Sequence, residues 1–265
     1  MDINYYINYD LPVPYRNINI YPVTVKEYLL FNAFGESLTV EKNIIPDVKI
    51  ITMTNLEYLF YSTLEKKEIT ETTHPYLLWF DRVLHICLKD DKSFESLEES
   101  IKRYKLDENN KPFFIIGDEK YTSEDFDKIK IIICNQNLME LPDRTISKEV
   151  RDSLEEARKY KEKLSGQNKG SLEDYMISLS IATGWTLEYI YSMTIRKFIK
   201  SIKRLDGLIH YKIYLSASMS GMVTFKDTSF IKHWLLGSDD DDKYKDVTMD
   251  LETIQSKVSM ESAKN

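Results

Sequence analysis

The chain has 265 residues and a formal net charge of −7, and 42% of its residues are hydrophobic and 30% are charged. This composition excludes wholesale disorder, and the length allows one large domain or two small ones. The negative charge argues against a protein that wraps nucleic acid, because neutralising phosphate groups needs a basic surface. With only two cysteines, and no apolar run near the roughly 18 residues that a membrane span needs, we expect a cytoplasmic protein without a membrane span. The eight glycines and seven prolines are few, which favours helices over a turn-rich sandwich.

The first hundred residues predict short helices that alternate with extended segments. Thr24 and Thr54 each precede a glutamate at capping-box spacing, so each is expected to begin a helix. The β-branched run Val48–Thr52 is typical of a strand. In chain order, the expected elements are an extended segment 11–15, a strand or extended arm 18–23, a helix from Val25 to about Leu38, the strand Val48–Thr52, a helix from Asn55 to about Glu65, a helix from Pro75 to about Lys89, and a short amphipathic stretch with Phe94, Leu97 and Ile101.

The middle of the chain predicts a strand followed by a helix. After a polar break at 106–111, the strand Phe113–Ile116 and a glycine turn lead to a helix capped by Thr122 or Ser123. The run Ile131–Cys134 is also compatible with a strand. We favour a helix, because apolar residues already recur at helical spacing before this run begins.

Polar caps divide the rest of the chain into helices. The expected helices are Lys148–Leu164 after Ser147, Leu172–Ala182 after Ser171, Leu187–Met193 after Thr186, and a long amphipathic helix Ile195–Ile213 after Thr194. Residues 165–170 form the clearest linker, and Gly207 indicates either a kink or a close contact in the long helix. An acidic run begins after Gly237 and is followed by a weak amphipathic pattern at Val247, Leu251, Ile254 and Val258.

These elements predict a mainly α protein with a few short strands (α+β) and a helical C-terminal module. The expected regions are an N-terminal α+β region 1–108, a strand-helix-helix middle region with its linker 109–169, the helical module 170–237, and an acidic, flexible tail 238–265.

No arrangement of residues in the sequence predicts catalysis, a metal site or a bound cofactor. None of the four histidines forms a pair at the i, i+4 spacing of a helical zinc site. The sequence has no Gly-rich phosphate loop and no Gly-x-Ser-x-Gly elbow. His85, between two apolar residues, is more typical of a core than of a ligand, and the basic residues of 196–204 are more typical of a solvated helix face than of a nucleic-acid site. We therefore expect a protein that is not an enzyme.

A cluster of apolar residues in and after the long helix is the best candidate for a partner-binding site. Methionine and aromatic side chains suit adaptable binding surfaces, and the alternative is that they close the hydrophobic core. The candidate partner-binding residues are Phe198, Ile202, Met219, Met222, Phe230 and Trp234.

Several segments of the chain have a distinctive sequence: Tyr121–Asn137, Ser171–Asp174, Thr183–Phe198, Ser220–Val223 and Ile231–Trp234. These segments resemble proteins of tailed bacteriophages from low-GC Gram-positive hosts, and within that group they are most similar to proteins described as tail assembly chaperones. The resemblance covers roughly residues 110–236, with weaker similarity over 11–60.

The resemblance implies a non-enzymatic protein that binds the tape-measure protein or the tail-tube protein. It would self-associate, act in the cytoplasm of the infected host, and keep its client's helices soluble until the tube polymerises. Such a task needs grooves that accept amphipathic helices, which the helix Ile195–Ile213 and the apolar cluster after it would supply. One alternative is a structural virion protein of the tail, connector or baseplate, and another is a phage regulator that binds a host protein.

Overall fold

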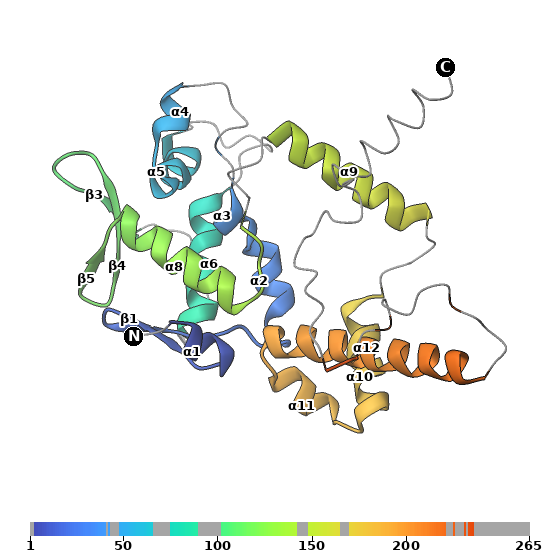
Figure 1. Ribbon diagram of the computed structural model, residues 1–265. Helices are drawn as coiled ribbons and strands as arrows, with labels where there is room; N and C mark the ends of the chain where they lie inside the picture. Colours follow the sequence, from blue (N-terminus) through green and yellow to red (C-terminus); the bar gives the residue numbers. More distant parts are fainter. Residues whose placement is uncertain are drawn as a thin grey trace, which may run out of the picture. The chain divides into compact units, whose positions relative to one another are not determined.

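The structure, a computed structural model, describes residues 3–40, 42, 48–65, 75–89, 102–141, 148–164, 170–220, 225, 231 and 233–235. This part of the chain is mainly helical with one two-stranded and one three-stranded antiparallel sheet, which confirms the predicted fold class (Figure 1). The chain divides into two compact units: unit 1 comprises 1–142 and 179–202, and unit 2 comprises 143–178 and 203–265. Residues 179–202 of the predicted C-terminal module thus belong to unit 1. The predicted stretch around Phe94 and the tail after residue 237 lie outside the described residues.

Unit 1 begins with a short helix and a hairpin: α1 (Ile3–Asn8), β1 (Val13–Tyr15) and β2 (Ile18–Ile20). The two strands pair antiparallel with Val13 opposite Ile20, and both of these side chains are buried. The extended segments predicted here are therefore confirmed as strands. The tight turn between them places Arg16 in the left-handed region, at a φ of 53°.

The helix predicted to begin at Val25 begins three residues later, and it is divided into α2 (Tyr28–Phe34) and α3 (Glu36–Thr39). The capping pair is present, because the N–H of Thr24 donates to Oε2 of Glu27 over 3.0 Å. However, Thr24 also forms a β-bridge with Thr194, and the N–H of Val25 donates to the carbonyl of Met193 over 2.9 Å. This pairing with a distant segment holds the chain extended and delays the start of the helix.

The predicted strand Val48–Thr52 is wrong, because these residues form the helix α4 (Val48–Thr52). The Thr52 hydroxyl donates to the carbonyl of Val48 over 3.0 Å, one helical turn back. Ile50 is the buried residue of this turn, while Val48 and Ile51 are exposed. The strand preference of β-branched residues is weak and depends on context, so the run by itself does not determine a strand.

The next helices begin where the sequence predicts. They are α5 (Asn55–Phe60), which continues into the π-helical turn η2 (Tyr61–Glu65), and α6 (Tyr76–Leu88). Both halves of the predicted capping box between Thr54 and Glu57 are present. Pro75 stands at the N-cap of α6, and Lys89 ends this helix in the left-handed conformation, at a φ of 53°.

A three-stranded sheet and a long helix complete the first 142 residues: β3 (Tyr104–Leu106), β4 (Pro112–Ile116), β5 (Glu119–Tyr121) and α8 (Ser123–Gln136). The prediction of β4 and of the glycine turn after it is confirmed, and Gly117 adopts a φ of 61°. The strands β3 and β5 were not predicted, since three residues are too few to show strand alternation. The preference for helix over Ile131–Cys134 is confirmed, and Thr122 is the cap.

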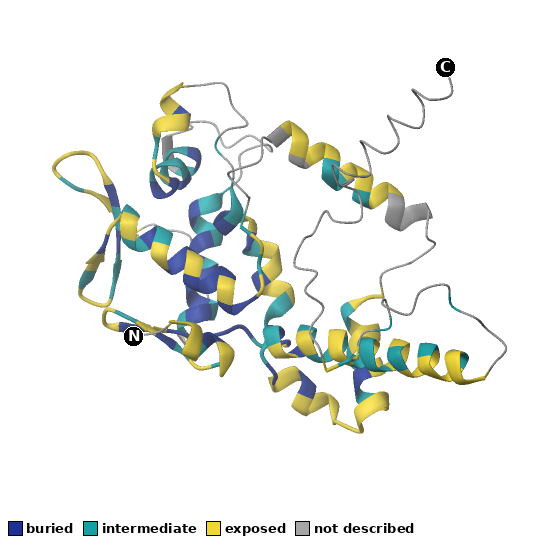
Figure 2. Ribbon diagram, in the orientation of Figure 1, coloured by how far each residue is buried: buried dark blue, intermediate teal, exposed yellow. Residues whose placement is uncertain are grey.

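Aromatic rings from α6, β4 and α8 meet in the core of unit 1. The ring centroid of Phe80 lies 4.6 Å from that of Phe126 and 5.7 Å from that of Phe114. The ring of Tyr121 stacks on Phe114 at 5.5 Å. All four side chains are buried, and the buried residues run through both α6 and α8 (Figure 2). Edge-to-face aromatic packing of this kind adds to the stabilisation from buried area.

The end of α8 ties the helix to the first segment of the chain. Gln136 Nε2 donates to the carbonyl of Ile20 over 3.0 Å. Asn137 Nδ2 donates to the carbonyl of Ile133, and its Oδ1 accepts the N–H of Val23, each over 2.8 Å. Both amide side chains are almost fully buried. The Gln-Asn pair that carries part of the phage resemblance therefore satisfies buried backbone groups.

The remaining helices begin at the predicted residues: α9 (Lys148–Leu164), α10 (Leu172–Thr183), α11 (Leu187–Ser192) and α12 (Ile195–Met219). Ser147, the predicted cap of α9, lies outside the described residues. The hydroxyls of Ser171, Thr186 and Thr194 each accept an N–H from three residues further on, over 3.1 to 3.3 Å. α12 is longer than predicted and passes through Gly207 without interruption. A Cβ at Gly207 would meet nothing within 4 Å, so the predicted close contact is wrong. None of the helices in the described ranges has the length and apolar character needed to cross a membrane.

Candidate partner-binding surface

The first turn of α12 is anchored in unit 1 by backbone hydrogen bonds and burial. The N–H of Ile195 donates to the carbonyl of Val23 over 2.8 Å, next to the bridge between Thr24 and Thr194. Ile195 and Phe198 are both buried in this unit. These contacts hold the start of the helix rigidly, so the helix begins from a fixed position within unit 1.

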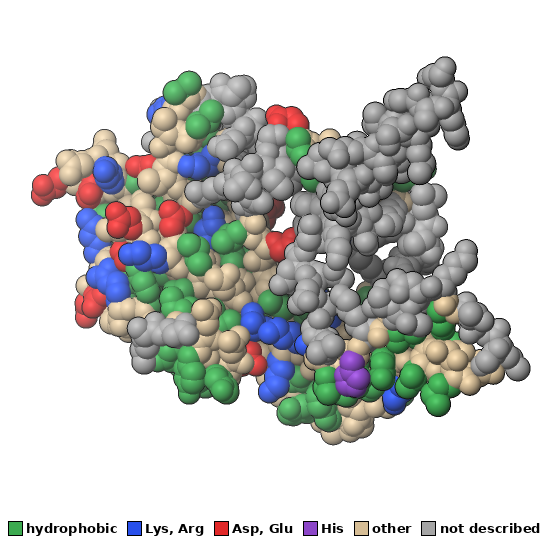
Figure 3. Space-filling view, viewed as in Figure 1, with side chains coloured by type: hydrophobic (Ala, Val, Ile, Leu, Met, Phe, Trp, Pro, Cys, Tyr) green, Lys and Arg blue, Asp and Glu red, His purple; other side chains and the backbone are tan. Residues whose placement is uncertain are grey.

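One face of α12 is apolar from Ile195 to Ile213. This face is buried at the start of the helix and exposed from Ile209 onward. Its side chains recur every three or four residues and therefore share a face. Ile202 and Leu205 are half-buried, whereas Ile209 and Ile213 are 47% and 56% exposed. We call Leu205, Ile209 and Ile213 the α12 stripe. Hydrophobic side chains are visible on the surface of α12 in the space-filling view (Figure 3).

The chain that follows α12 packs on another side of the helix. The ring of Phe225 lies 6.4 Å from that of Tyr214, and the ring of His233 lies 5.0 Å from that of Tyr211. Nη1 of Arg204 donates to the carbonyl of Trp234 over 3.0 Å. The described residues of this segment therefore run along α12 in the direction opposite to that of the helix.

The residues that this returning segment contacts do not belong to the α12 stripe. At about 100° per residue, Tyr211 lies about 200° around the helix from Ile209. The returning segment therefore leaves Ile209 and Ile213 exposed. Exposed apolar residues are common when scattered, but two of them on one face of a helix mark a surface able to take a partner.

The six residues predicted to bind a partner have different environments. Phe198 is only 2% exposed, so it belongs to the core of unit 1 and is not on the surface. Ile202 and Trp234 are half-buried, and Met219 is 79% exposed. Two further predicted residues lie outside the described part of the chain: Met222 and Phe230.

A second exposed apolar surface lies in unit 1 and was not predicted from the sequence. Ile181 at the end of α10 is 80% exposed, and Trp185, Tyr189 and Tyr191 on and before α11 are partly exposed. The rings of Trp185 and Tyr189 contact each other edge to face at 5.3 Å. We call Trp185 and Tyr189 the α11 surface. The signal that could have revealed it is the density of aromatic residues in a helix too short to bury them all.

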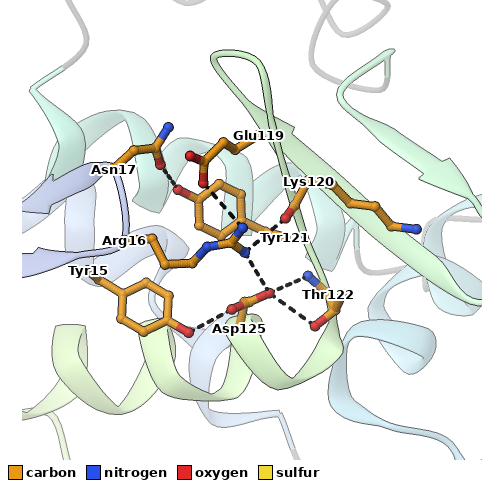
Figure 4. A network of polar contacts seen from close by, with 8 residues as sticks. All are labelled: Tyr15, Arg16, Asn17, Glu119, Lys120, Tyr121, Thr122 and Asp125. Atoms are coloured by element: carbon orange, nitrogen blue, oxygen red, sulfur yellow. Dashed lines mark hydrogen bonds and ion pairs between the residues drawn. The ribbon is translucent and has the colours of Figure 1, made fainter.

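The main polar network shown at close range joins the β1–β2 turn to the start of α8 (Figure 4). The Tyr15 hydroxyl donates to Oδ1 of Asp125 over 2.7 Å. Nη1 of Arg16 donates to Oδ2 of Asp125 over 3.2 Å and to the carbonyl of Lys120 over 2.9 Å. Nη2 of Arg16 pairs with Glu119 at 3.2 Å, and the guanidinium carbon lies 4.7 Å from the ring centre of Tyr121.

The charged groups of this network pair with one another, which points to a structural role. Burial alone would raise the pKa of Asp125, but hydrogen bonds from Thr122 and Tyr15 and the charge of Arg16 together hold it below its ordinary value. Burial and the bond to Asp125 raise the pKa of Tyr15. Asp125 thus stays ionised and Tyr15 stays protonated near neutral pH, and neither is prepared for proton transfer. We assign the network to holding the hairpin on α8.

A buried charged group lies between α6 and β3. Asp81 is fully buried, with Oδ2 at 3.4 Å from Nε2 of His85 and Oδ1 at 3.8 Å from Nη1 of Arg103. Burial, and the negative charge of Asp81, raise the pKa of Tyr104 well above its ordinary value. His85 is buried on α6, as predicted for a core histidine. Arg103 and His85 thus both lie within ion-pair distance of the Asp81 side chain.

The two cysteines are free thiols in the core of unit 1. Cys87 and Cys134 are both buried, and burial raises the pKa of Cys134 to about 11 and that of Cys87 further. A thiol with a raised pKa is a poor nucleophile at neutral pH. Among the residues that the structure describes, no group of three or more His, Cys, Asp or Glu side chains is placed to hold a metal ion.

One known family model matches the part of the chain that contains both apolar surfaces. Residues 163–239 match the family model described as the YomV second domain, a phage-derived family. This match covers α10, α11 and α12 and therefore includes the α11 surface and the α12 stripe. No curated protein and no solved structure matches the chain. The family match supports the conclusion that the chain is a phage protein.

Proposed function

We propose that this phage protein is a non-enzymatic morphogenesis factor, a tail assembly chaperone that binds a helix of the tape-measure or tail-tube protein. The observation that carries the proposal is the α12 stripe, an exposed apolar face on a long helix within the phage-family match. The resemblance of residues 110–236 to tail chaperones supports the same function.

The stripe suits reversible binding of a helix. Side chains at i and i+4 on one helix contact the apolar face of a second helix laid along it. Burying an isoleucine side chain fully contributes about 1.5–3 kcal/mol, and Ile209 and Ile213 are each about half exposed. The two isoleucines together therefore contribute about 1.5–3 kcal/mol, which is only part of the free energy that a bound client needs and leaves the contact reversible. We place the protein in the host cytoplasm for this task.

Co-expression of the full chain with each candidate client tests the proposal. Replacing Ile209 and Ile213 with aspartate puts two charges into the stripe, and we expect captured client to fall by about tenfold or more. The matched control, His210→Asp with Ser218→Asp, adds two carboxylates to exposed positions elsewhere on α12 and should retain the client. The proposal fails if the unaltered chain captures neither client, or if both double variants capture it equally.

The α11 surface favours a second candidate, a structural protein of the tail, connector or baseplate. Its exposed Trp185 and Tyr189 are residue types that dominate stable interfaces. Mass spectrometry of purified particles separates the two functions. Stoichiometric presence of the chain in finished particles would favour the structural protein, and its absence would favour the chaperone.

A further inference from the structure

The first turns of α12 have a strongly basic face. Between Thr194 and Leu205 the chain has five basic residues and no carboxylate. They are Arg196, Lys197, Lys200, Lys203 and Arg204. At about 100° per residue, these side chains lie within about 120° around the helix, on the side opposite the α12 stripe. Three of them belong to unit 1, and we call Arg196, Lys197 and Lys200 the α12 basic face.

The lysines of this face are exposed, whereas its arginine is half-buried and connects it to two other elements of unit 1. Nη1 of Arg196 donates to the carbonyl of Asn135, near the end of α8, over 3.1 Å. Nη2 donates to Oδ1 of Asn8, the last residue of α1, over 3.4 Å. These bonds place the end of α1 beside the first turn of α12. In the space-filling view, Lys and Arg side chains gather over the start of α12 (Figure 3).

Exposed tyrosine rings adjoin this contact. Tyr5 on α1 is 53% exposed, and Tyr9, the residue after Asn8, is 67% exposed. The ring centroids of Tyr5 and Tyr9 lie 4.9 Å apart, and the ring of Tyr6 meets that of Tyr5 edge to face at 5.6 Å. We call Tyr5 and Tyr9 the tyrosine pair. Through Asn8 and Arg196, the pair lies next to the α12 basic face.

The local charge of this surface is positive although the whole chain is acidic. Residues 3–11 and 194–202 contain three basic residues and one carboxylate, Asp10. The net charge of −7 is a sum over all 265 residues. Charges more than about 8 Å away are largely screened at physiological ionic strength, so a bound polyanion responds mainly to the nearby cations. The surface can therefore attract a polyanion.

The exposed rings indicate which polyanion suits this surface. Proteins that bind single-stranded nucleic acid combine cations, which contact the phosphates, with aromatic side chains on which the bases stack. An acidic protein segment would use the cations but would gain little from the tyrosine rings. A duplex keeps its bases stacked on one another, so it cannot offer them to the rings. The combination favours a single strand.

We propose that the α12 basic face and the tyrosine pair bind single-stranded nucleic acid. Lys197 and Lys200 contact phosphates, and Tyr5 and Tyr9 stack on bases. Arg196 acts as a positioning residue, because its two hydrogen bonds hold α1 beside the lysines. The site goes beyond the proposed function and does not rest on it, since the α12 stripe lies on the opposite side of the helix.

Fluorescence anisotropy of the full chain with labelled oligothymidine and oligouridine, each of about 15 nucleotides, tests the proposal and compares DNA with RNA. Lys197→Gln with Lys200→Gln removes two phosphate contacts. We expect the affinity at about 50 mM salt to fall about tenfold or more, and the slope of log K against log salt to flatten by about 1.4. The matched control, Lys128→Gln with Lys159→Gln, removes the same charge from exposed positions on α8 and α9 and should bind like the unaltered chain.

Alanine at Tyr9 tests stacking separately from charge. Tyr9→Ala should weaken binding about fivefold or more and leave the salt slope unchanged, because a base loses its ring while the phosphate contacts remain. Tyr160→Ala on α9 is the matched control, since Tyr160 is 66% exposed and Tyr9 is 67% exposed, and it should have no effect. Circular dichroism checks that every variant keeps its helical fold.

The results that would overturn the proposal differ in what they assign to this surface. Binding to neither oligonucleotide would overturn it, and so would equal binding by the two lysine double variants. Displacement of the oligonucleotide by polyglutamate, together with unchanged binding by Tyr9→Ala, would assign the basic face to an acidic protein segment. Binding to phosphatidylglycerol vesicles without binding to either oligonucleotide would assign it to a membrane surface.

Client capture by the same lysine variant keeps this inference separate from the proposed function. Lys197→Gln with Lys200→Gln leaves the α12 stripe unaltered, so it should capture as much client as the unaltered chain. Oligonucleotide binding without any captured client supports the nucleic-acid site and refutes the chaperone. Captured client without oligonucleotide binding refutes the nucleic-acid site and leaves the chaperone intact.

Discussion

At the scale of single residues, Asp125 shows how one side chain serves both local and distant structure. It caps α8, because its Oδ2 accepts the N–H of Thr122 over 2.8 Å, and it also accepts from Tyr15 and Arg16 more than a hundred positions away. The cap at Thr122 was predictable from spacing along the chain. The partners on the hairpin were not, since only the fold brings them to the start of α8.

We expect Asp125→Ala to lower the free energy of unfolding by about 2 kcal/mol, because it removes a cap and leaves the Tyr15 hydroxyl and Arg16 without their shared acceptor. Asp174→Ala is the matched control, since Asp174 caps α10 through Ser171 but its side chain is exposed. Its loss should be clearly smaller. Urea unfolding of both variants measures the difference, and equal losses would contradict a role for Asp125 beyond capping.

The same carboxylate makes stability depend on pH in a predictable direction. The pKa of Asp125 is lowered in the folded protein, so its contribution is fully present above the unfolded pKa of about 3.9 and is lost as the pH falls through the folded value. The stability difference between the unaltered protein and Asp125→Asn should be constant from pH 7 to about pH 5 and shrink below about pH 4. Urea unfolding at several pH values measures it, and a difference that grows in acid would contradict the assignment.

At the scale of elements, two helical glycines differ in what surrounds them. Gly207 lies in α12 with open space where a Cβ would stand, and its backbone is helical. Gly35 lies between α2 and α3, where a Cβ would be 2.5 Å from Cε of Met139 and 3.1 Å from the carbonyl of Phe31. Sequence spacing drew attention to Gly207, but the glycine that packing requires is Gly35.

Alanine at the two positions should therefore have opposite effects. Gly207→Ala is expected to stabilise the protein by about 0.5–1 kcal/mol, because it removes the entropic cost of a helical glycine without a clash. Gly35→Ala should destabilise it by about 1–3 kcal/mol, since Met139 and the Phe31 backbone must shift. Thermal unfolding followed by circular dichroism compares them. A destabilised Gly207→Ala would indicate that something contacts this side of α12.

At the scale of the whole molecule, the chain crosses between two units through the helices α10 and α12. Unit 1 contains the aromatic core, both cysteines and the anchored start of α12. The exposed half of the α12 stripe belongs to unit 2. One continuous helix thus carries an apolar face that is core at one end and surface at the other.

The two native thiols should report the unfolding of unit 1. Cys87 on α6 and Cys134 on α8 are both buried, and their raised pKa values disfavour the reactive thiolate. In a urea titration with brief thiol labelling, we expect both to become reactive at one common midpoint, because they share a core. Labelling of either cysteine well before the other, identified by peptide mass, would show that α6 and α8 do not unfold together.

The sequence by itself determined the features that depend on neighbours three or four residues apart. The starts of α5, α8, α10, α11 and α12 follow from polar caps, because a cap hydroxyl reaches the N–H group in its own first turn. The mainly helical class followed from these starts and from the apolar spacing between them.

The tertiary structure alone decided which of those apolar residues form the core. Phe198 and Ile209 lie on one face of one helix and look equivalent in the sequence, yet the first is buried in unit 1 and the second is about half exposed. A distant segment also delayed the helix after Val25. Burial is set by chain segments far away in the sequence, so local pattern predicts that a face is apolar but not whether the fold covers it.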